Sequence, residues 1–174
     1  LHTEAEVRVE TILPSFRKGA VVRALMSAHP YEEPAFDLYP LKNTWNQVGS
    51  GVVGELVEPE TETEFLKRIK KLFEVGCVKH TRLTGRLIQK VALCGGSGAF
   101  LASRAVGSGA DVFITGEIKY HDYFNYENQI LMAEIGHYES EQYTKEIFYS
   151  IIRDLCPDVE VQMTRVNTNP IKYL

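Results

Sequence analysis

Cysteine is scarce in this chain, and its distribution excludes two common uses of the residue. The 174 residues include three cysteines, Cys77, Cys94 and Cys156, and no two of them stand in a Cys-x-x-Cys spacing. A cysteine zinc cage needs paired spacings, and a disulfide framework uses an even set. We therefore expect reduced thiols and a cytoplasmic protein, because reducing compartments keep thiols unpaired.

A basic surplus and a long apolar run are missing too. The net charge is −4, whereas proteins that bind nucleic acid normally carry excess Lys and Arg, so we expect no nucleic-acid partner. No apolar stretch reaches the roughly 20 residues that span a bilayer, so we expect no membrane association. Residues 1–10 lack the regions of a signal peptide. Because the chain starts at Leu1, without methionine, and enters a strand pattern almost at once, we expect the C-terminal part of a longer polypeptide.

The first half carries the pattern of a small two-layer domain. Alternation of apolar and polar residues predicts strands at residues 6–13, 35–41, 51–57 and 78–84. Helical spacing predicts helices over about residues 15–28 and 62–75, the second opened by a capping box from Thr61 to Glu64. The resulting order, βαββαβ, is ferredoxin-like, and we place a domain boundary near Gly85-Arg86, giving domains 1–85 and 86–174.

The second half predicts an α/β lobe with a mostly parallel sheet. Strands are expected at residues 88–94, 111–115, 130–135 and 159–163, and helices at about 99–106, 119–126 and 140–155. In such sheets, functional groups gather beyond the carboxyl ends of the strands. Those ends carry Gly95–Gly98, Thr115–Glu117 and Gly136-His137, so we expect these three clusters to meet at one rim.

The pair His137 and Glu141 is the strongest candidate for metal ligation. The two residues are four apart at a predicted helix start, so their side chains share a helix face. Imidazole and carboxylate suit zinc, iron or manganese. An active site usually needs about three protein ligands, and within this chain the others would have to be His121, Glu117 or Asp122. The alternative is an exposed ion pair at a helix start.

Glu117 and His121 form a second pair with the same spacing. They follow the predicted strand at residues 111–115 and could serve as metal ligands, as supports for ligands, or as an acid/base pair. The alternative is a carboxylate at a helix start beside an exposed histidine.

The glycine-rich turn Gly95, Gly96, Ser97 and Gly98 lies between a predicted strand and a predicted helix. Such a turn exposes backbone N–H groups that can bind an anion. No Gly-Lys-Ser/Thr follows, which excludes a P-loop, and Leu101 stands where a dinucleotide fingerprint has its third glycine. The alternative is a plain tight turn.

Four stretches together resemble the NGG-interacting-factor-three (Nif-three) family, whose bacterial members are often labelled GTP cyclohydrolase I type 2 homologs. These stretches are residues 90–98, 111–122, 136–141 and 168–171. The first half, with His29–Pro34 and Asp37–Leu41, resembles the domain inserted in longer family members, which is similar in fold to PII signalling proteins and CutA copper-tolerance proteins. The polar segment 167–171 could fold back towards the rim.

The resemblance implies two divalent metal ions held between two α/β lobes. His137 and Glu141 would be the ligands from the C-terminal lobe, and the others belong to an N-terminal lobe that is absent here. If the parent protein is an enzyme, we expect metal-assisted hydrolysis, with Glu117 and His121 as catalytic candidates and with Gly95–Gly98 as a turn that could receive a phosphate or carboxylate. The expected partners are a small molecule, which could be a nucleotide, and further copies in a hexameric ring. The alternative is a non-catalytic metal-binding scaffold or regulatory interaction module.

Overall fold

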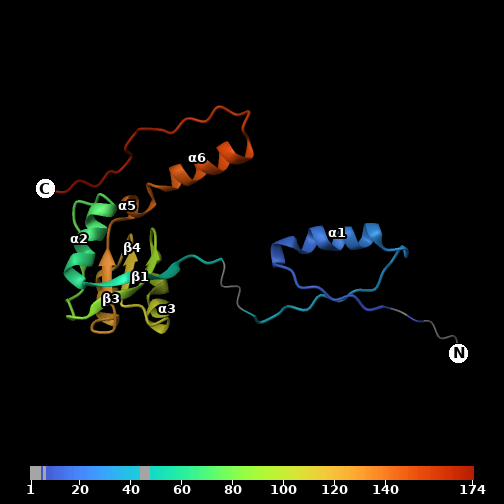
Figure 1. The fold of residues 1–174 in the computed structure, drawn as a ribbon, viewed down its shortest axis with the longest axis horizontal. Helices are drawn as coiled ribbons and strands as arrows, with labels where there is room; N and C mark the ends of the chain where they lie inside the picture. The colour runs from blue at the N-terminus through green and yellow to red at the C-terminus, as the bar shows by residue number, and fades with distance from the viewer. Residues whose placement is uncertain (1–4, 6, 44–47) are drawn as a thin grey trace. The chain divides into compact units, whose positions relative to one another are not determined.

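A five-stranded mixed sheet forms the centre of the larger part of the chain. The computed structural model describes residues 5, 7–43 and 48–174, and their contacts divide into two units, residues 1–45 and 46–174. The sheet lies in the second unit (Figure 1), and its strand order is β1-β3-β4-β5-β2. Its strands are β1 Val52–Thr61, β2 Lys79–His80, β3 Leu87–Cys94, β4 Val112–Thr115 and β5 Leu131–Glu134.

The central strands β3, β4 and β5 run parallel, while β1 and β2 pair antiparallel with β3 and β5. The mixed α/β class with a mostly parallel central sheet is therefore confirmed. All residues of β4 and β5 are buried, as expected for parallel strands covered on both faces.

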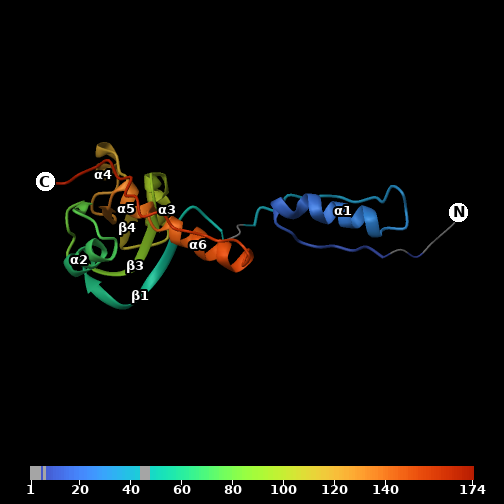
Figure 2. The ribbon, with the colours of Figure 1, turned by 90° about the horizontal axis from the view of Figure 1, so that it is seen from above.

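Helices cover both faces of the sheet. Helix α2 (Glu62–Leu72) packs Phe65, Leu66 and Ile69 against one face, where Val112, Ile114 and Leu131 are among the buried strand residues. Helix α3 (Ala102–Gly107) packs against the other face, with the 3₁₀ turn η2 (Gly98–Leu101) before it. Three helices follow: α4 Tyr120–Asn125, α5 His137–Glu141 and α6 Thr144–Leu155 (Figures 1 and 2).

The first unit contains the 3₁₀ turn η1 (Ser15–Arg17) and helix α1 (Lys18–Ala28). None of the helices among the described residues combines the length and apolarity that a membrane crossing requires.

The element order expected for residues 1–85 differs from the structure in two places. The described residues of 7–13 and 35–41 form no strand, and Val7 and Val9 are 88% and 85% exposed. Alternation shows that a segment suits a strand, but a strand forms only where another backbone offers hydrogen bonds. Strands β1 and β2 do form, and they pair with β3 and β5, so the sheet continues across Gly85-Arg86.

Three further elements differ from those expected. Strand β1 continues through Pro59, which is tolerated because β1 is an edge strand whose register shifts between Glu55 and Glu60. The helix expected at residues 140–155 is divided into α5 and α6. Residues 159–163 form no strand.

The start of α2 is fixed by the expected capping box and by one buried carboxylate. Thr61 Oγ1 accepts from Glu64 N, and Thr61 N donates to Glu64 Oε2, each at 3.3 Å. The neighbouring Glu62 is 4% exposed, and its carboxylate accepts hydrogen bonds from Thr84 N, Thr84 Oγ1 and Gly85 N at 2.8–3.0 Å. Glu62 therefore ties α2 to the segment that leads into β3.

Replacing Glu62 by Ala should lower the free energy of unfolding at neutral pH by about 1–3 kcal/mol, because Thr84 N, Thr84 Oγ1 and Gly85 N would lose their buried acceptor. Burial raises the pKa of Glu62, but the hydrogen bonds from Thr84 and Gly85 outweigh it and hold the pKa below its usual 4.5. The stabilisation is thus complete above the pKa of the unfolded chain and is lost as pH falls through the folded pKa. Urea denaturation at pH 7 and at decreasing acidic pH, with exposed Glu58→Ala as control, measures it; an equal loss at every pH would contradict this account.

Candidate functional site

The three parallel strands end side by side. Cys94 of β3 pairs with Thr115 of β4, and Thr115 pairs with Glu134 of β5. The segments that leave these strands therefore start from the same edge of the sheet. They are the glycine-rich turn, the loop with Glu117, and the turn into α5 with His137, so the three clusters meet as the parallel arrangement predicted.

The glycine-rich turn is packed against α5 and β4. Gly96 N donates to Ser140 Oγ at 2.9 Å, and Gly98 N donates to Thr115 Oγ1 at 3.0 Å. A Cβ on Gly96 would lie 2.3 Å from Glu141 Oε1, and the φ of Gly96 is +61°. Glycine at position 96 thus lets Glu141 approach the backbone. Two of the N–H groups considered for anion binding are occupied within the protein, and the anion site stays a prediction.

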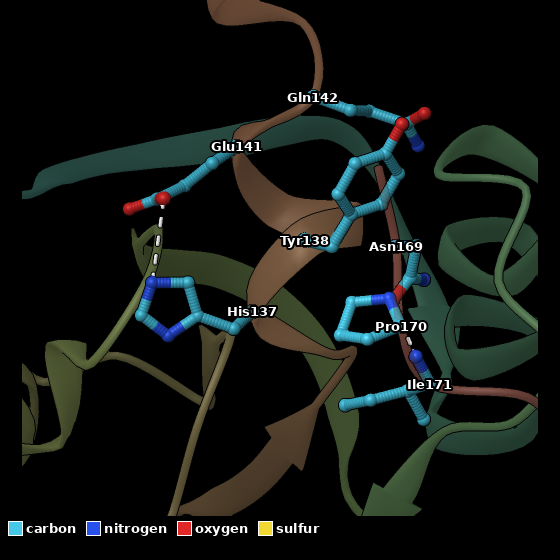
Figure 3. A pocket seen from close by; sticks show the side chains of 7 residues that line it. All are labelled: His137, Tyr138, Glu141, Gln142, Asn169, Pro170 and Ile171. Carbon is cyan, nitrogen blue, oxygen red and sulfur yellow. Dashed lines mark hydrogen bonds and ion pairs between the residues drawn. The ribbon is translucent and has the colours of Figure 1, made fainter. Parts of the chain in front are cut away.

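His137 lies between two carboxylates. Its Nδ1 is 3.3 Å from Glu117 Oε2, and its Nε2 is 3.3 Å from Glu141 Oε2 (Figure 3 shows the second contact). The side chains of His137, Glu117 and Glu141 are 49%, 56% and 53% exposed, so solvent and solutes reach all three.

Ser97 fixes the carboxylate on the Nδ1 side. Its hydroxyl donates to Glu117 Oε2 at 2.7 Å, and this hydrogen bond, followed by that from His137, holds the pKa of Glu117 below its usual value. An ionised Glu117 accepts a hydrogen bond from Nδ1–H of the neutral imidazole, and in that tautomer the Nε2 lone pair faces Glu141.

The Nε2 and Oε2 atoms of His137 and Glu141 suit a shared cation. The contact is an exposed ion pair when the imidazole is protonated; when the imidazole is neutral with its proton on Nδ1, the Nε2 lone pair and Glu141 Oε2 are two electron donors 3.3 Å apart. Bond lengths of about 2.0–2.2 Å to a tetrahedral ion place neighbouring nitrogen and oxygen ligands roughly 3.4 Å apart. The described residues contain no group of three or more His, Cys, Asp or Glu placed to hold a metal ion. The pair therefore fits a divalent metal as two ligands of a larger set.

His121 is not brought into this cluster. It lies in α4, where its ring contacts Tyr120 at a centroid distance of 5.3 Å. Among the described residues, no hydrogen bond or ion pair joins His121 to Glu117, His137 or Glu141, so its catalytic role stays a prediction.

A buried residue that we did not single out from the sequence, Glu134, supports the loop that carries Glu117. Glu134 is 7% exposed at the end of β5; its Oε2 accepts from Ile118 N at 3.2 Å and from the Tyr123 hydroxyl at 2.8 Å, and its Oε1 accepts from Lys79 Nζ. Burial, together with the hydrogen bond to Glu134, raises the pKa of Tyr123, which keeps its hydroxyl a donor.

An open pocket of about 370 Å³ adjoins His137 and Glu141, which we call the metal-suited pair. Its wall is shared between α5 with the residue after it and the C-terminal tail: His137, Tyr138, Glu141, Gln142, Asn169, Pro170 and Ile171 (Figure 3). The tail thus folds back to the rim. The lining offers apolar surface and two side-chain amides, and it contains no Lys or Arg.

Comparisons with known proteins agree along most of the chain. A protein of Halalkalibacterium halodurans named GTP cyclohydrolase 1 type 2 homolog is 36% identical over 173 residues, which is 97% of this chain and 46% of the relative. The protein of the same name from Bacillus subtilis is 33% identical over 178 residues, again covering 97% and 46%. The chain therefore spans about half the length of these relatives.

Solved structures give the same result. The Staphylococcus aureus protein SA1388 matches with a TM-score of 0.74 and 28% identity, covering 95% of this chain and 55% of that one. A Bacillus cereus protein related to NIF3 matches with a TM-score of 0.73 and 27% identity, covering 93% and 46%. The profile of the family described as Duf34/NIF3 (NGG1p interacting factor 3) matches residues 7–170, and the chain belongs to this family.

Proposed function

We propose that this chain supplies half of a two-metal site, with His137 and Glu141 as its ligands. The observation that carries the proposal is the contact between His137 Nε2 and Glu141 Oε2, at a separation that suits two ligands of one ion, while Glu117 holds the opposite ring nitrogen. Zinc, iron and manganese are the ions that this donor set favours. The remaining ligands would come from the part of the relatives' length that this chain does not span.

The proposed chemistry is metal-dependent hydrolysis, which the name shared by the relatives supports. A divalent ion lowers the pKa of bound water and stabilises developing negative charge. Glu117 orients His137 through Nδ1 and, being half exposed, can also exchange a proton with a ligand at the rim. His121 stays a candidate acid or base from the neighbouring helix.

The proposed ligand is a small molecule in the pocket beside His137 and Glu141. The pocket suits a flat, partly apolar body with hydrogen-bonding edges, such as the base of a nucleotide, because its lining combines Tyr138 and Pro170 with the amides of Gln142 and Asn169. A phosphate would have to be held elsewhere, and Gly95–Gly98 remains the candidate. We also propose a cytoplasmic protein that assembles into a hexameric ring.

A non-catalytic scaffold is the second candidate. Two ligands on an exposed rim bind a metal without accelerating a reaction unless a substrate is positioned beside them. In that case the metal would join parts of an assembly, and the rest of the chain would serve interactions.

Zinc titration of the chain by calorimetry should reveal one weak site that depends on His137. Replacing His137 or Glu141 by Ala should abolish binding, and Glu117→Ala should weaken it about 10–100-fold because the imidazole loses its orienting acceptor. His80→Ala, which removes a histidine elsewhere in the same unit, should leave binding unchanged. Zinc affinity retained in His137→Ala would contradict the assignment.

Gly96→Ala should displace Glu141 and weaken zinc binding beyond its effect on stability. The new methyl group would overlap Glu141 Oε1, and the positive φ adds strain of about 1 kcal/mol. Gly109→Ala is the matched control, because Gly109 has φ +74° and no heavy atom within 4 Å of an added Cβ. Both variants should lose stability in thermal unfolding, but Gly96→Ala alone should lose zinc affinity; equal affinities would show that the glycine has no role at the site.

Turnover separates the enzyme from the scaffold. The whole natural protein that contains this chain, loaded with zinc or manganese, should hydrolyse a nucleotide such as GTP, and His137→Ala should abolish the activity because it removes a metal ligand. Product formation followed by chromatography is the measurement. Activity that survives His137→Ala would exclude hydrolysis at this site, and no turnover by a metal-loaded protein would favour the scaffold.

A further inference from the structure

The C-terminal tail forms the outer wall of the pocket, and one of its residues is set deeper than the others. Asn169 is half-buried, whereas Asn167, Thr168 and Pro170 are exposed. Figure 3 shows Asn169, Pro170 and Ile171 on the same side of α5 as Tyr138, with His137 and Glu141 on the opposite side. The contacts that hold Asn169 therefore determine the position of the tail residues that form this wall of the pocket.

Asn169 uses both ends of its side-chain amide. Its Nδ2 donates to Glu139 Oε1 at 2.8 Å, and its Oδ1 accepts from Ile171 N at 3.0 Å. The first bond ties the tail to α5, and the second shapes the tail around the pocket. Aspartate has nearly the same shape, but it could make only the second of these bonds because it has no N–H donor.

Glu139 is held in place from the opposite side. It is 6% exposed, and a Cβ on Gly136 would lie 2.1 Å from its Oε2, so the glycine provides the space that the carboxylate occupies. Glu139 Oε2 has no hydrogen-bond partner among the described residues. The bond from Asn169 is therefore the main compensation for this buried carboxylate, and its loss is costly.

The position of Glu139 on α5 connects the tail to the metal-suited pair. Helix α5 presents His137 and Glu141 to the pocket and Glu139 to the interior, all within residues 137–141. A displacement of Glu139 would thus move the element that carries both proposed ligands.

We propose that Asn169 is a positioning residue: by bonding to buried Glu139, it fixes residues 167–171 against α5 as the wall of the ligand pocket. The proposal rests on the proposed function only in taking this pocket as the ligand site.

Hydrogen exchange of residues 166–174, measured by mass spectrometry on the intact chain, tests the bond. Asn169→Asp should raise exchange in this segment about tenfold or more, because a hydrogen bond to a charged group is replaced by repulsion between carboxylates. The double variant Glu139→Gln with Asn169→Asp should restore protection, since it re-forms the amide–carboxylate pair with donor and acceptor exchanged. Gln162→Ala is the control, because it removes an exposed amide that bonds to Glu160 two residues away.

Broadening of NMR signals by Mn²⁺ tests the effect on the pocket. Mn²⁺ at the His137–Glu141 pair should broaden the signals of Asn169 and Ile171. The broadening should be weaker in Asn169→Asp and should return to its original extent in the double variant. Unchanged exchange in Asn169→Asp, or faster exchange with unchanged broadening, would overturn the proposal. Failure of every variant to bind Mn²⁺ would instead refute the proposed metal site, and the exchange rates would then decide whether the bond holds the tail.

Discussion

The alignment of three strand ends is the constraint on which the candidate site depends. The parallel pairing places Cys94, Thr115 and Glu134 in one row at the edge of the sheet. The Thr115 hydroxyl then accepts a hydrogen bond from Gly98 N of the glycine-rich turn. The Glu134 carboxylate accepts from Ile118 N and from the Tyr123 hydroxyl, both in the segment after β4. A shift of one residue in either pairing would turn these side chains to the other face of the sheet. The register is fixed in turn by the fully buried residues of β4 and β5.

The sequence allowed the elements of the second half to be predicted better than those of the first. Strands β4 and β5 are short apolar runs beside helical patterns, and the capping box at Thr61 specifies the start of α2 by contacts within four residues. A local sequence pattern does not show which distant strand a segment will pair with. The alternation around Val7 and Val9 could therefore suggest strands that the structure does not contain, while β1 pairs with β3 over more than twenty residues of intervening chain.

The candidate site divides in the same way. The closeness of His137 and Glu141 follows from their spacing within α5, so it could be predicted. The contact of Glu117 with His137 depends on the register of β4 and β5, and the bond from Asn169 to Glu139 depends on the path of the tail. His121 has the same spacing from Glu117 as Glu141 has from His137. It nevertheless stays outside the cluster, because Glu117 precedes α4 and the two residues do not share a helix.

Helix α5 is too short to hold its own geometry. An isolated helix needs about 12–15 residues to be even marginally stable in water, and α5 covers residues 137–141. Its conformation must therefore come from its surroundings: Ser140 Oγ accepts from Gly96 N, and Glu139 is enclosed beside Gly136. The distance between the His137 and Glu141 side chains thus depends on glycines, because only residues without a Cβ let α5 pack so closely. Substitutions at Gly96 or Gly136 should therefore change the geometry of His137 and Glu141, although neither glycine is itself a metal ligand.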